Sequence, residues 1–269
     1  MKKMIFYTVL LFAALSFIYP FIWMISASLA PESEIGSLVL FPNSFTLDSY
    51  TQMFSKIPIG RALFNSILVS SIVTFGVLVF GSMVGYALSK LEFKGRELIF
   101  YIIIFTMTLP FQITLIPQYI LMVKFGWVDT YAALIVPYLM NALAIIMFRQ
   151  YFKSIPTDLL DAARIDGCGE LRILFTILWP NALPAIVTIG ILTFMASWNE
   201  VLWPLIVIRD ESLMTMPQLV TLFAVGGRAD AQLGVKLASA ILLALPIMIA
   251  YLFFQKYFIQ SMASTGLKE

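Results

Sequence analysis

Long, nearly uncharged apolar runs constrain this chain more than any other feature. A helix that crosses the hydrocarbon core of a bilayer needs roughly 20 apolar residues. Six runs of this kind cover residues 4–28, 63–88, 98–122, 131–149, 183–208 and 233–255. Apolar residues are continuous within the runs and do not alternate with polar ones, which predicts helices. We therefore expect an all-α, polytopic membrane protein with six transmembrane helices.

The composition excludes a soluble globular domain. Apolar residues make up 61% of the 269 residues and charged residues only 12%, whereas soluble domains carry about 25% charged residues. So few charges cannot cover a surface that faces water. We expect residues 1–269 to form a single transmembrane domain.

Several kinds of chemistry are excluded by what the sequence lacks. It has no histidine and a single cysteine, Cys168, so it offers no histidine-based catalysis, internal disulfide or cysteine-based metal site. It has no Gly-x-x-x-x-Gly-Lys-Ser/Thr motif to bind a nucleotide, and a net charge of +2 gives no nucleic-acid footprint. We expect a chain without catalytic residues, metal ligands or a cofactor of its own.

The positive charges predict the orientation. Lys2 and Lys3 precede an apolar run that is too long for a signal peptide, whose apolar region is about 7–15 residues, so we expect an uncleaved first span. With six spans and a cytoplasmic N-terminus, most of the 17 lysine and arginine residues fall on the cytoplasmic side, as positive charge favours. Both termini are therefore expected in the cytoplasm.

Small and polar residues inside the spans predict helix packing. Gly81, Gly85 and Ser89 recur every four residues, a spacing that lets two helix backbones approach closely. Asn65 and Asn141 are expected to form hydrogen bonds across helices, and prolines within the runs are expected to bend them.

Residues 154–182 form the longest cytoplasmic loop and contain a short predicted helix. Thr157 is a suitable N-cap and Gly167 a suitable C-terminal cap. A helix of this length is marginal in water, since isolated helices need about 12–15 residues. It must therefore dock, either on a partner with a groove or on the bundle of spans itself.

The loop motif resembles a known family. Asp161-Ala162-Ala163-Arg164-Ile165-Asp166-Gly167, followed by Ile177, Pro180 and Pro184, is similar to the EAA loop in permease subunits of binding-protein-dependent ABC importers. Asp161 stands where the family usually has glutamate. Segments such as 85–90, 198–205 and 255–258 resemble the carbohydrate branch, most of all the second permease of maltose-type and arabino-oligosaccharide-type importers.

The resemblance implies a function and a set of partners. It implies a bacterial inner-membrane permease that works with a second homologous permease, two cytoplasmic ATPase subunits, an extracytoplasmic sugar-binding protein and membrane lipid. ATP and Mg would bind the partner ATPase and not this chain. The helix at 158–167 would then couple the permease to an ATPase subunit through Asp161, Ala162, Ala163, Arg164, Asp166 and Gly167.

Two further sites are implied with open alternatives. Ser197, Asn199 and Glu200 match the zone in which the partner permease of the maltose system holds sugar, but Glu200 is equally well interpreted as an interfacial charge. Gly226, Gly227 and Arg228 lie in a loop that approaches the binding protein in this family, or form a plain connector.

Other classes of function stay open on the sequence alone. A related importer for a non-sugar solute would share the loop motif. An ion-driven secondary transporter would need several buried carboxylates, and a membrane enzyme a cluster of polar groups at one depth. Among the acidic residues, only Glu200 falls plausibly within a span.

Overall fold

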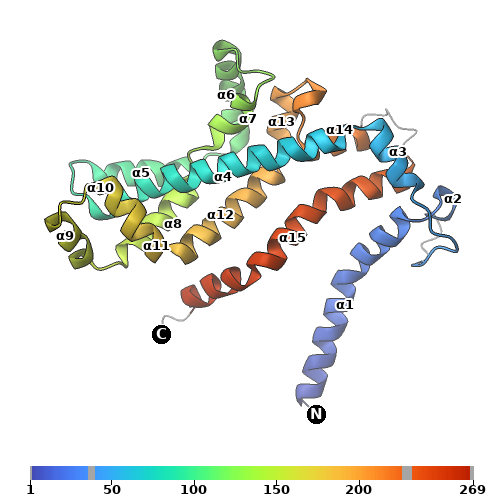
Figure 1. Cartoon of the computed structure of the whole chain (residues 1–269), viewed down its shortest axis with the longest axis horizontal. Helices are drawn as coiled ribbons and strands as arrows, with labels where there is room; N and C mark the ends of the chain where they lie inside the picture. Colours follow the sequence, from blue (N-terminus) through green and yellow to red (C-terminus); the bar gives the residue numbers. More distant parts are fainter. Residues whose placement is uncertain (1, 36–39, 226–231, 267–269) are drawn as a thin grey trace. The chain divides into compact units, whose positions relative to one another are not determined.

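The computed structural model describes residues 2–35, 40–225 and 232–266 (Figure 1). Every regular element in these ranges is a helix, so the all-α prediction is confirmed for the part of the chain that is described. The elements are α1 (Lys2–Ser28), α2 (Glu32–Ile35), α3 (Asp48–Lys56), α4 (Ile59–Lys90), α5 (Arg96–Thr106), α6 (Phe111–Phe125), α7 (Tyr131–Ile135), η1 (Val136–Tyr138), α8 (Ala142–Lys153), α9 (Thr157–Ile165), α10 (Glu170–Arg172), η2 (Ile173–Leu178), α11 (Trp179–Asn181), α12 (Leu183–Trp198), α13 (Leu202–Val207), η3 (Glu211–Leu213), α14 (Met216–Val225) and α15 (Leu233–Gly266).

Two helices are each long and apolar enough to cross a membrane. They are α1, over Lys3–Ser28, and α4, over Ile59–Lys90. Three bent pairs of shorter helices pass the same test together, with bends of 100° between α5 and α6, 41° between η1 and α8, and 89° between α11 and α12. Length and composition of the described residues thus support two to five spans, and the count of six stays a prediction.

The run 183–208, which we predicted as one continuous span, is two helices. α12 ends at Trp198 and α13 begins at Leu202. A continuous helix would place the ring of Pro204 against the carbonyl of Glu200 and would lose one backbone hydrogen bond. In the observed arrangement Pro204 lies in the first turn of α13, where its missing N–H costs nothing.

The chain forms two compact units. The first contains Met1–Leu63 and Thr215–Ile249. At the end of α1, Ala27 and Ala30 pack with Ile35, Trp23 and Leu237. The backbone N–H groups of Leu233 and Gly234, at the start of α15, donate to the carboxylate of Glu32. A carboxylate at this position satisfies N–H groups that have no partner within the helix.

The second unit contains Phe64–Met214 and Ala250–Glu269. Here the predicted close approach of helices is observed, because Gly81 and Gly85 of α4 face α8. A Cβ atom on Gly85 would lie 2.6 Å from the Cβ atom of Phe148 and 3.0 Å from the backbone nitrogen of Arg149. Only glycine allows α4 and α8 to approach to this distance.

Asn65 and Asn141 have different roles in this unit. The Asn65 amide donates to the carbonyls of Ser212 and Met214, both at 2.9 Å, and accepts from the Tyr131 hydroxyl at 2.6 Å. The prediction of a bond across elements is therefore confirmed for Asn65. Asn141 instead caps its own helix, α8, by accepting from the N–H of Ala144 at 3.0 Å, because the bend before α8 creates a new helix start.

Candidate functional site

The predicted loop helix is α9, and its C-terminal end is closed as expected. Gly167 has φ +80°, a left-handed conformation that favours glycine. Its N–H donates to the carbonyl of Arg164 at 3.0 Å, and the N–H of Cys168 donates to the carbonyl of Ala163 at 2.9 Å. These two bonds form a Schellman motif, which fixes the end of α9 at the predicted glycine.

The start of α9 differs from the prediction by one residue. Pro156 occupies the N-cap position, and Thr157 is the first residue of the helix, with no side-chain cap bond. Pro156 has an extended backbone, φ −57° and ψ 138°, which suits the fixed φ of proline and the geometry of an N-cap. The prediction that Thr157 caps the helix was therefore wrong.

α9 has one buried and one exposed face. Leu160 is fully buried and Ala163 is 7% exposed. These two residues pack α9 against the rest of the second unit. The remaining apolar side chains point outward, with Leu159 43% and Ile165 87% exposed. This exposed apolar face is the candidate for a surface that binds another protein.

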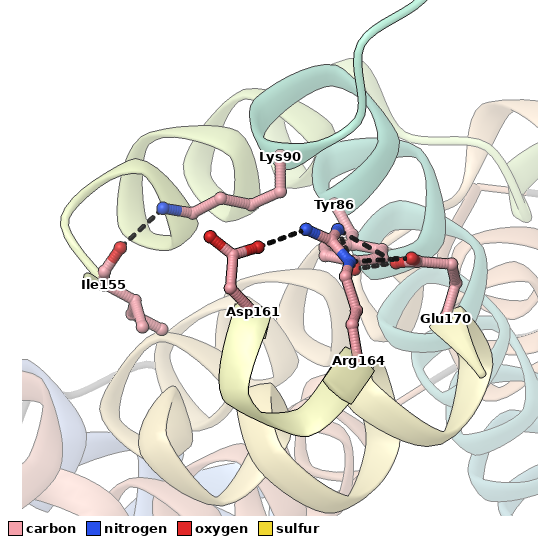
Figure 2. A network of polar contacts seen from close by, with 6 residues as sticks. All are labelled: Tyr86, Lys90, Ile155, Asp161, Arg164 and Glu170. Carbon is pink, nitrogen blue, oxygen red and sulfur yellow. Dashed lines mark hydrogen bonds and ion pairs between the residues drawn. The ribbon is translucent and has the colours of Figure 1, made fainter. Parts of the chain in front are cut away.

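A polar network connects α9 to α4 (Figure 2). The Arg164 guanidinium donates to Asp161 at 2.9 Å and to Glu170 at 3.0 Å. Its remaining nitrogen lies 3.5 Å from the hydroxyl of Tyr86, and this hydroxyl donates to the second carboxylate oxygen of Glu170. Arg164 therefore binds carboxylates on both sides of the Gly167 turn, and Glu170 joins it to α4.

The charges of this network reinforce one another. The hydrogen bond from Arg164, followed by that from Tyr86, holds the pKa of the Glu170 carboxyl below its usual range. The same bond to Glu170 raises the pKa of the Arg164 guanidinium. Both groups are therefore charged at neutral pH. The side chain of Glu170 is 44% exposed, so water screens much of the attraction.

Two more contacts hold the loop near the end of α4. The ammonium group of Lys90 donates to the carbonyl of Ile155 (Figure 2), just before α9. The indole N–H of Trp179 donates to the hydroxyl of Ser82 at 3.0 Å, after α9. Sequence reasoning did not single out Tyr86, Glu170, Ser82 or Trp179, since no local pattern signals contacts between residues more than 80 positions apart.

Ser197, Asn199 and Glu200 lie at the break between α12 and α13. Glu200 accepts from the backbone N–H of Trp203 at 3.1 Å, at the start of α13. The amide of Asn199 is exposed and donates to the carbonyl of Met195 at 2.9 Å. These bonds explain why polar side chains suit the break, and a role in a solute pathway stays a prediction.

The other predicted loop, Gly226, Gly227 and Arg228, lies outside the described residues. Among the residues that the structure does describe, no group of three or more His, Cys, Asp or Glu side chains could hold a metal ion. The site around α9 thus consists of an exposed apolar face, a fixed helix end and an ionic connection to α4.

Comparison with known proteins identifies the family. The model of the family described as "Binding-protein-dependent transport system inner membrane component" matches residues 77–264. The chain belongs to this family. It is therefore an inner-membrane, non-catalytic component of a transport system, which confirms the resemblance noted in the sequence.

Curated relatives in this permease family cover nearly the whole chain. The arabinooligosaccharides transport system permease protein of Halalkalibacterium halodurans is 37% identical, over 96% of this chain and 94% of its own. The trehalose/maltose transport system permease protein of Thermococcus litoralis is 33% identical, over 93% and 91%.

A solved structure has the same fold. It is a chain of a bacterial ABC transporter involved in the import of the acidic polysaccharide alginate. It is 26% identical, covers 96% of both chains and has a TM-score of 0.87. The polytopic, all-helical architecture of the permease is therefore confirmed.

Proposed function

We propose that this permease is a membrane-spanning subunit of an ATP-driven importer for di- or oligosaccharides. It forms half of the translocation pathway, and a second homologous permease forms the other half. The relatives support a carbohydrate solute, because their names specify arabino-oligosaccharides, trehalose or maltose, and alginate.

The exposed apolar face of α9 carries the coupling part of the proposal. Leu159, Ala162 and Ile165 project from a short helix whose opposite face packs on the rest of the second unit. One of two cytoplasmic ATPase subunits binds this face. ATP and Mg bind the ATPase, and closure of the ATPase dimer displaces α9.

The orientation follows from the position of α9. If α9 meets a cytoplasmic ATPase, both termini lie in the cytoplasm with it, because six spans and an excess of positive charge on that side are expected. The segment between α1 and α4 then faces outward, where an extracytoplasmic sugar-binding protein docks with help from Gly226, Gly227 and Arg228. Ser197, Asn199 and Glu200 line the pathway, at a helix break of the kind that holds solutes in transporters.

Transport by the reconstituted assembly tests the proposal. The chain is co-expressed with its partner permease, ATPase and binding protein, and uptake of arabino-oligosaccharides and maltodextrins into proteoliposomes is compared with uptake of a glycerophosphodiester. We expect ATP-dependent uptake of a carbohydrate that stops with an ATPase variant unable to hydrolyse ATP. Uptake of the phosphodiester alone, or uptake driven by an ion gradient without ATP, would contradict the proposal.

A further inference from the structure

The segment that follows α9 is attached at both ends to one face of α4. We call residues 170–179 the bracket. At its start Glu170 accepts from Tyr86, and at its end Trp179 donates to Ser82. Ser82 and Tyr86 are four residues apart, so they are neighbours on one side of α4.

The bracket is packed as well as hydrogen-bonded. Ile173, Leu174 and Leu178 in its middle are buried, within a π-helix, η2, that is rare in proteins and frequent at functional sites. Tyr86 is 3% exposed, so its hydroxyl is held in a fixed position. The bracket is therefore held on α4 by two hydrogen bonds and is buried along its middle.

The backbone that connects α9 to the bracket is less restrained than the bracket itself. Gly167 and Gly169 lie between them, and a Cβ atom on either would meet no atom within 4 Å. The Schellman bonds fix the end of α9 itself, but with no side chain packed on either glycine the backbone beyond that end restrains the angle between α9 and the bracket only weakly. The ion pair between Arg164 and Glu170 spans this turn, and the bond from Tyr86 continues the connection into α4.

We propose that Tyr86 and Glu170 are positioning residues that make α9 and α4 move as one body. A displacement of α9 then reaches α4 directly through Arg164, Glu170 and Tyr86, besides travelling along the chain into α12. This inference rests on the proposed function, because it assumes that a partner ATPase displaces α9.

The ratio of solute uptake to ATP hydrolysis tests the inference. The variants are Tyr86→Phe, which removes one oxygen atom and keeps the ring, Glu170→Gln, which keeps the shape and removes the charge, and the double variant. Arg172→Gln, an exposed change within the bracket, is the matched control. All are measured in the complete assembly after copurification of the ATPase has been checked.

We expect each single variant to retain the ATPase and its hydrolysis rate while the ratio falls about fivefold to tenfold, the effect of losing one typical protein hydrogen bond. Because the two residues act through one bond, the double variant should fall no further than the lower single variant. The control should keep the parental ratio. A purely structural role would instead lower uptake and hydrolysis in proportion.

The inference is overturned if both single variants keep the parental ratio, or if the two losses multiply in the double variant. If Glu170→Gln does not assemble, Tyr86→Phe alone tests the inference: a lower ratio supports it and a parental ratio overturns it. A parental chain that never copurifies with an ATPase would contradict the proposed function, which separates the two failures.

Discussion

The guanidinium of Arg164 and the carboxylate of Glu170 form an ion pair across the Gly167 turn, with 3.0 Å between Nε and Oε1. Arg164 belongs to α9 and Glu170 to the segment attached to α4. With the bond from Tyr86 to Glu170, the pair therefore joins α9 to α4, a helix long enough to cross a membrane.

Acid should remove the contribution of Glu170. Its pKa is lowered in the folded protein, so its ionised form stabilises the fold at neutral pH, and this stabilisation is lost as the pH falls below the ordinary glutamate pKa of about 4.3. With solvent screening the contribution is about 0.5–1 kcal/mol. The free energy of unfolding of parent and Glu170→Gln should differ by this amount at pH 7, and the difference should shrink as the pH falls below about 4.3. A difference that grows toward acid pH would contradict the assignment.

Gly167→Ala should destabilise the end of α9. A residue with a Cβ atom in the left-handed region costs about 1–2 kcal/mol, and Gly167 has φ +80°. Gly169→Ala is the control, because Gly169 has φ −71° and open space around it. Hydrogen exchange of residues 157–165 in the purified chain should quicken in the first variant and stay parental in the second. Equal exchange in the two variants would show that the turn does not hold α9.

Gly85→Ala should destabilise the packing of α4 against α8. The new methyl group would overlap Phe148 and the backbone of Arg149, and overpacking of this kind costs about 1–3 kcal/mol. Gly60→Ala lies in the same helix with nothing within 4 Å, so it should be neutral or stabilising by up to about 1 kcal/mol. Thermal unfolding in detergent measures both. Similar midpoints for the two variants would contradict the close packing.

Arg149→Lys should weaken the contact between α8 and the C-terminal end of α4 in the second unit. Arg149 is 6% exposed, donates to the carbonyl of Leu88 at 3.1 Å and to Glu97 at 2.8 Å, and lies over the ring of Phe100. Lysine keeps the charge and cannot form all these contacts, so we expect a loss of about 1–3 kcal/mol. Lys153→Arg, at the exposed end of the same helix, is the control for thermal unfolding. An unchanged midpoint for Arg149→Lys would show that a positive charge at this position is sufficient for stability and that the individual guanidinium contacts are not needed.

Local patterns in the sequence predicted what depends on local chemistry. Apolar runs gave the positions of the long helices, and Gly167 gave the end of α9, because helix length and a left-handed turn are properties of neighbouring residues. The break at Glu200 was not foreseen, since Pro204 can either bend a helix or begin a new one. The bond between Tyr86 and Glu170 joins residues 84 positions apart and depends on tertiary packing, which no local pattern contains.

Photo-crosslinking from Ile165 tests the central claim, that the exposed face of α9 binds the ATPase. A photoreactive phenylalanine analogue replaces Ile165, and in a separate chain it replaces Phe41, which is 65% exposed in the segment between α1 and α4. Both chains are assembled with their partners and irradiated. We expect a crosslink to the ATPase subunit from position 165 and none from position 41. If the analogue at position 165 forms no crosslink to the ATPase in an assembly that still transports solute, the exposed face of α9 does not bind the ATPase.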